Sequence, residues 1–136
     1  MSDCKPVSTP ISTSTKPFDS GGDAMPNPTD YRSIVGALQY VTLTRPDVSF
    51  TVNRACQFMH SPTIAHWQLV KRILRYLKST RTHGLLFDRS SSRSLQAFSD
   101  ANWARDSIDR KSIGGFAIFL GPNLISWTSC KQRTVA

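Results

Sequence analysis

The sequence predicts an α+β protein in which helices precede strands. Apolar residues recur at helical spacing between residues 29 and 82, whereas beyond residue 83 they form short runs bounded by glycine, proline or serine. The first 28 residues differ from both parts, because they are rich in proline, serine and threonine and offer no apolar face. We therefore expect an extended, disordered lead-in (1–28), a helical region (29–82) and a strand-rich region (83–136).

Two helices are predicted between Thr29 and Met59. Thr29 or Asp30 can cap the first helix, which should end before Pro46. Its apolar residues follow helical spacing: Tyr31, Ile34, Val35, Leu38 and Val41. The second helix should run from about Asp47 to Met59, with one apolar face formed by Val48, Val52, Ala55, Cys56 and Met59.

The third predicted helix, from Pro62 to about Ser79 with Ser61 as its N-cap, is the clearest element. Its apolar stripe consists of Trp67, Val70, Ile73, Leu74 and Leu77. A basic ridge runs along the same helix and consists of Lys71, Arg75 and Lys78 at spacings of four and three residues, with Arg72 nearby. Such a charge run is usually a solvated outer face, and contact with nucleic-acid phosphates is the alternative.

Beyond residue 83, four short apolar segments are predicted as strands, at residues 84–87, 95–99, 114–120 and 124–128. Gly121, Pro122 and Asn123 separate the last two segments, which favours a hairpin. A sheet with an apolar face needs a covering element, and no helix is predicted after Trp127. We therefore expect partly uncovered strands, with aggregation or partial disorder in this half of the chain.

Asp100 is the best catalytic candidate because it lies at the far end of the strand predicted from residue 95. Most aspartates in such a position only solvate a turn or cap a helix. All nine acidic residues of the chain are aspartates, so a mechanism that requires a glutamate must obtain it from elsewhere.

The net charge of +8 and the isoelectric point near 9.9 favour a polyanionic partner such as nucleic acid, although a merely basic surface would look the same. Cys4, Cys56 and Cys130 form no CxxC pair, which gives no support to a disulfide framework or a zinc site. The sequence has no apolar run of membrane-spanning length and no secretory signal. We expect an intracellular protein, cytoplasmic or nuclear, without a membrane partner.

The segments YRSIVGALQY (31–40), VKRILRYLK (70–78) and SDANWA (99–104), together with several shorter motifs, resemble Ty1/copia-type retrotransposon Pol polyproteins. The segments that resemble the region downstream of the reverse transcriptase palm are DCKPVSTP (3–10), YRSIVGALQY (31–40), TRPDV (44–48), QFMHSP (57–62), HW (66–67) and VKRILRYLK (70–78). The segments that resemble the opening of the ribonuclease H domain are SDANWA (99–104), DRKS (109–112), and ISW (125–127) followed by Lys131 and Gln132. The resemblance covers nearly the whole chain in one order.

The resemblance implies a fragment that spans the thumb and connection of a reverse transcriptase and the first three strands of a ribonuclease H domain. Asp100 then matches the first of several carboxylates that hold two Mg²⁺ ions in that fold. The family's next ligand is a glutamate beyond residue 136, and the paired aspartates of the polymerase site are absent. We therefore expect this fragment alone to bind no Mg²⁺ and to catalyse no reaction.

The implied partners are an RNA–DNA hybrid and the remainder of the Pol polyprotein. Binding to a hybrid would use Lys71, Arg72, Arg75 and Lys78, and it should be weak, sequence-indifferent and salt-dependent. Two alternatives stay open. The chain could be part of an active hybrid-cleaving ribonuclease within a longer polyprotein, or it could be an unrelated DNA-binding module that resembles a helix-turn-helix.

Overall fold

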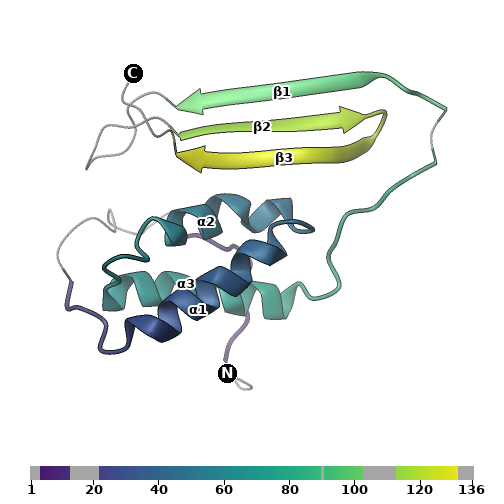
Figure 1. The fold of residues 1–136 in the computed structure, drawn as a ribbon. Coiled ribbons are helices and arrows are strands. Elements are labelled where there is room, and N and C mark those ends of the chain that lie inside the picture. Colours follow the sequence, from purple (N-terminus) through teal and green to yellow (C-terminus); the bar gives the residue numbers. More distant parts are fainter. Residues whose placement is uncertain (1–3, 13–21, 90, 103–112, 132–136) are drawn as a thin grey trace. The chain divides into compact units, whose positions relative to one another are not determined.

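The computed structural model describes residues 4–12, 22–89, 91–102 and 113–131, which belong to two compact units, Met1–His83 and Gly84–Ala136 (Figure 1). The first unit contains the helices α1 (Pro28–Val41), α2 (Pro46–Cys56) and α3 (Ile64–Ser79). The second contains the strands β1 (Leu95–Asn102), β2 (Ile113–Leu120) and β3 (Asn123–Lys131). The α+β class, with helices before strands, is confirmed.

The core of the first unit lies between the three helices. Its buried apolar residues are Tyr31, Val35, Leu38, Val48, Val52, Ala55, Leu69, Val70 and Ile73. The hydroxyl of Tyr31 donates a hydrogen bond of 2.8 Å to the Ala55 carbonyl, so its polar end is satisfied inside the core. Burial of this hydroxyl raises the pKa of Tyr31, because the charged phenolate would lose its hydration.

The starts of α1 and α3 differ from those predicted. The side chain of Asn27 accepts from the Thr29 backbone N–H, so α1 begins earlier than a Thr29 or Asp30 cap would allow. Ser61 does not cap α3. Thr63 does so instead, because its Oγ1 accepts from the His66 N–H while His66 Nδ1 accepts from the Thr63 N–H, at 3.4 and 3.0 Å. This reciprocal pair is a capping box, which satisfies two helix-end donors at once.

A buried arginine joins the start of α2 to the end of α3. The guanidinium of Arg45 donates to both carboxylate oxygens of Asp47, at 2.9 and 2.7 Å, and to the backbone and side-chain oxygens of Thr80. The Tyr76 hydroxyl also donates to Asp47, at 2.8 Å. Hydrogen bonds from Arg45 hold the pKa of Asp47 below its ordinary value.

The described residues of the predicted lead-in contact both ends of α3 and its middle. Residues 4–12, which we call the strap, approach the helix where the Val7 carbonyl accepts from Ser79 Oγ at 3.0 Å. Farther along the chain, the backbones of Asp23 and Met25 bond to residues 62–64 at the start of α3. The segment therefore runs antiparallel to α3, and the folded part includes residues before Thr29.

The strands form an antiparallel sheet in the order β1-β2-β3. Leu120 pairs with Asn123, so Gly121 and Pro122 make a two-residue hairpin turn. Gly121 has a φ of 56°, which fits a type II′ turn with glycine in its first central position. The turn confirms the predicted hairpin between the last two apolar segments.

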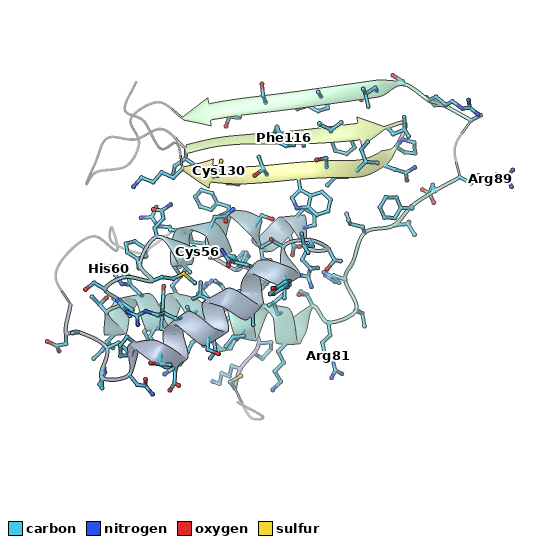
Figure 2. All side chains as sticks on the ribbon, in the orientation of Figure 1. Cys56, His60, Arg81, Arg89, Phe116 and Cys130 are labelled. Atoms are coloured by element: carbon cyan, nitrogen blue, oxygen red, sulfur yellow. The ribbon has the colours of Figure 1, made fainter. Side chains whose placement is uncertain are left out.

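Both faces of the sheet carry apolar side chains. The register places Leu95, Phe116 and Leu120 on one face, and Phe98 and Phe119 on the other. The rings of Phe98 and Phe119 meet edge to face, with centroids 5.9 Å apart. Several of these side chains remain exposed, among them Leu95 at 68% and Phe98 at 60%. Figure 2 labels Phe116 on the central strand.

The apolar segment 84–87 forms no strand, which corrects the prediction for these residues. Leu86 and Phe87 are 80% and 61% exposed. A strand needs a neighbour for its backbone groups, and this segment pairs with none of the three described strands. The chain is instead fixed at Asp88, whose backbone N–H and C=O both bond to the side-chain amide of Asn123 at 2.8 and 2.9 Å.

Candidate nucleic-acid interface

The four basic residues predicted to contact nucleic acid all lie on α3, outside the set of buried core residues. At 100° per residue, Lys71, Arg75 and Lys78 fall within an arc of about 60° on the side of the helix opposite Val70 and Ile73. Lys78 is exposed, and the other basic side chains are half-buried. We call Lys71, Arg75 and Lys78 the basic face of α3.

Lys71 is held next to an aromatic ring. Its Nζ lies 5.8 Å from the centroid of the Trp67 ring, one helical turn earlier. A cation over an indole face is attracted by the electron-rich ring, and the attraction still leaves the ammonium group able to bind an anion. This contact reduces the number of positions that Lys71 samples before a ligand arrives.

Along the helix axis, Arg75 lies between Lys71 and Lys78, and its Nε is a buried donor without a hydrogen-bond partner among the described residues. A buried donor left unpaired costs on the order of 1–3 kcal/mol. Reorientation of this side chain toward an anion would remove that cost. The positive charge of Arg75 and its unpaired Nε thus both favour an anionic ligand.

Arg72 differs from the other three residues because the strap occupies its guanidinium. Its Nε donates to the Thr9 carbonyl at 3.1 Å, and its Nη2 donates to Thr9 Oγ1 at 2.8 Å. On the helix, Arg72 and Ser79 lie on one flank of Arg75, with Lys71 and Lys78 on the other. The structure therefore places Lys71, Arg75 and Lys78 on one face of α3, and it places Arg72 beside that face in contact with the strap.

Asp100 lies on β1 opposite Gly115, and its side chain is exposed. Within the described residues, no three His, Cys, Asp or Glu side chains come together in a way that could hold a metal ion. Asp106 and Asp109 lie outside the described residues. The described residues therefore do not fit a site for two Mg²⁺ ions, and we derive no catalytic step through such ions.

Two contacts described above were not predicted from the sequence: that of Arg72 with Thr9, and that of Arg45 with Asp47. The strap has no apolar periodicity, so nothing in its composition indicates that Thr9 would reach Arg72. The ion pair of Arg45 and Asp47 could have been predicted, because the two residues flank Pro46 at the start of a helix. An acid in the first turn beside a preceding arginine is a favourable arrangement for an ion pair.

In the described ranges, none of the helices combines the length and the apolar character that crossing a bilayer requires.

Comparison with known proteins identifies relatives along the whole chain. The chain is 49% identical over 135 residues to a retrovirus-related Pol polyprotein from transposon RE2 of Arabidopsis thaliana, a match that covers 99% of this chain and 9% of the polyprotein. It is 50% identical over 142 residues to an uncharacterized mitochondrial protein of the same plant, across 100% of this chain and 56% of the relative. A secreted RxLR effector protein, number 161, of Plasmopara viticola is 47% identical over 107 residues, or 78% of this chain and 75% of the relative.

No protein-family model matches the chain, and no solved structure matches it with statistical significance.

Proposed function

Because the chain belongs to the Pol polyprotein family of copia-type retrotransposons, we propose that it is a segment that holds an RNA–DNA hybrid through α3 and catalyses no reaction by itself. The chain spans about a tenth of the length of the RE2 polyprotein, so the activities of a whole Pol polyprotein enter only as part of this proposal. The helical unit would act as the thumb and connection, and the sheet would be the first part of a ribonuclease H domain.

The basic face of α3 is the observation that carries the proposal. With a rise of 1.5 Å per residue, Lys71 and Lys78 lie about 10 Å apart along the helix axis. Successive phosphates of one strand are spaced about 3.4 Å along a DNA duplex axis, so the face spans about three phosphate-to-phosphate steps. Contacts of this kind recognise phosphates and the shape of the duplex, and they should be indifferent to base sequence.

The experiment measures the affinity of the chain for a fluorescein-labelled RNA–DNA hybrid by anisotropy at several salt concentrations. In Lys71→Gln/Lys78→Gln, we expect weaker binding and a plot of log K against log[salt] that is shallower by about 1.8, or about 0.9 for each lost phosphate contact. The matched control is Arg89→Gln/Arg93→Gln. It removes the same charge from exposed residues before β1, where Arg89 extends away from the strands (Figure 2).

Equal losses in the two double variants would contradict the proposal, because the effect would then come from net charge alone. Binding that does not change with salt would contradict it as well.

The alternative of a helix-turn-helix module is not favoured by the helical unit. Residues 57–63, seven in number, separate α2 from α3. The turn of a helix-turn-helix has three or four residues, which fixes the angle at which the second helix enters the major groove. A longer connection removes that constraint, so we do not propose sequence-specific reading of DNA.

For Asp100, we propose a role as a metal ligand only when further carboxylates of a longer Pol polyprotein join it. Hydrolysis of RNA by two metal ions requires carboxylates from several elements that converge on one point. This chain contains nine acidic residues, all of them aspartates, and the described ones form no such group.

A further inference from the structure

We infer that the strap competes with nucleic acid for α3 and keeps Arg72 in reserve until a phosphate displaces Thr9. The inference rests on the proposed function of the basic face and adds a regulatory element to it. In this arrangement, Arg72 becomes available to a ligand when the strap leaves.

The position of the strap supports competition. Its contacts with α3 are made at Arg72 and Ser79, which are seven residues apart and therefore lie on nearly the same line along the helix. This line borders the basic face on the flank opposite Lys71 and Lys78. A duplex that lies across the basic face and reaches Arg72 would have to occupy the space of the strap.

To reach Arg72, a ligand must replace the two hydrogen bonds that Thr9 accepts from this side chain. Val7 and Ile11 of the strap are half-buried, but neither packs against the helical core. Thr9 itself is exposed, and it offers Arg72 only neutral oxygen acceptors. A phosphate adds a negative charge to the acceptor, and it can accept two parallel hydrogen bonds from one guanidinium. Exchange of Thr9 for a phosphate should therefore favour the bound state.

A separate anchor lies farther along the chain than the strap. The backbone bonds of Asp23 and Met25 anchor the chain at the start of α3, far along the helix from Ser79. Release of residues 4–12 breaks the bonds at Val7 and Thr9, together with the contacts of Cys4 and Ser12, and leaves this anchor intact. The helical core does not need to open.

The test uses the full chain and the fluorescein-labelled hybrid of the previous experiment. Thr9→Ala removes the side-chain acceptor of Arg72, and we expect it to tighten hybrid binding on the order of fivefold, as the loss of one net hydrogen bond from the competing state would. Thr9→Glu places a carboxylate beside Arg72 and should weaken binding. Ser8→Glu is its matched control, because it adds the same charge to the neighbouring exposed residue.

A double-mutant cycle makes the test specific to Arg72. In an Arg72→Gln background, Thr9→Ala should no longer tighten binding, since no cation is left to release. Circular dichroism of each variant shows whether the helices are intact.

The outcomes separate this inference from the proposed function. Binding that depends on Lys71 and Lys78 but is the same in wild type and Thr9→Ala overturns the strap inference alone, as does equal weakening by Thr9→Glu and Ser8→Glu. Absence of binding in every variant, Thr9→Ala included, overturns both. Binding by Thr9→Ala when the wild type binds too weakly to measure supports both.

Discussion

Arg45 is a charged side chain with only 7% of its surface exposed, so its guanidinium depends on acceptors inside the protein. Asp47 supplies the compensating charge, and Thr80 supplies two further oxygens at the end of α3. When such a pair is intact, its net contribution is small, because desolvation offsets attraction. When one partner is removed, the remaining charge is left buried and uncompensated.

We therefore expect Asp47→Asn to lower the free energy of unfolding of the helical unit by about 2 kcal/mol, below the value for a fully buried pair because Asp47 is partly exposed. Urea unfolding followed by circular dichroism measures the change. Asp30→Asn in the first turn of α1 serves as the control. It should cost no more than about 0.5 kcal/mol, the contribution of an exposed charge at a helix start. Equal losses in both variants would contradict the role of the pair.

The same pair gives a pH dependence with a definite sign. The pKa of Asp47 is lowered in the folded state from an ordinary value of 3.8, so the unfolded state takes up a proton first as pH falls. The stability contributed by Asp47 should be complete above about pH 5 and should decline as pH falls through the lowered folded pKa. The stability difference between wild type and Asp47→Asn should therefore be constant at neutral pH and shrink in acid.

At the level of single elements, α3 depends on the reciprocal cap at its start. His66 serves this cap in two ways, because its Nδ1 accepts from the Thr63 N–H and its ring stacks on Phe58 with centroids 3.8 Å apart. A buried histidine in the third position thus does what glutamate or glutamine does in the usual capping box. α3 carries the basic face, so its first turn also positions the candidate interface.

His66→Ala should lower the free energy of unfolding by about 1–2 kcal/mol, since it removes both the cap and the ring stack. His66→Gln is the matched variant, because glutamine can restore the bond to Thr63 without the stack. We expect its loss to lie between those of wild type and His66→Ala in urea unfolding. If glutamine were as damaging as alanine, the contribution of the cap would be negligible.

The elements differ in how well the sequence predicts them. α1, α2 and α3 were predicted because their apolar residues follow helical spacing, which one face of a helix requires regardless of its neighbours. The start of α2 was predicted to within one residue, but the starts of α1 and α3 were not, since composition does not say which of several neighbouring polar residues will cap a helix. Residues 84–87 have the composition of a strand, but composition does not specify a neighbouring strand. The candidate interface was predicted as a row of cations, whereas the partner of Arg72 lies 63 positions away in the sequence.

At the scale of the whole molecule, basic residues outnumber the acidic residues that could bind metal ions. Lysine and arginine number 17 against 9 aspartates, and there is no glutamate. This excess of positive charge is what the proposed contact with a polyanion requires. The described part of it does not collect the carboxylates that hydrolysis by two metal ions requires.

We expect the isolated chain to leave the RNA strand of a hybrid intact in the presence of Mg²⁺. In a longer Pol polyprotein that includes this segment, Asp100→Asn should abolish cleavage and leave hybrid binding unchanged. Gel analysis of labelled RNA measures cleavage, and anisotropy measures binding. Mg²⁺-dependent cleavage by the isolated chain that disappears in Asp100→Asn would show that the proposal of a non-catalytic segment is wrong.

The strap has a consequence for the order in which the protein folds. Its contacts join residues 63 and 72 positions apart, whereas Tyr31 and Ala55 in the core are separated by 24. Contacts between distant positions cost more loop-closure entropy, so they tend to form after local ones. The strap should dock last, onto helices that are already packed, and in the native protein it should open more often than they do. During folding, the Arg72 side chain therefore remains without its Thr9 partner until the strap docks. A ligand can select the same state in the folded protein.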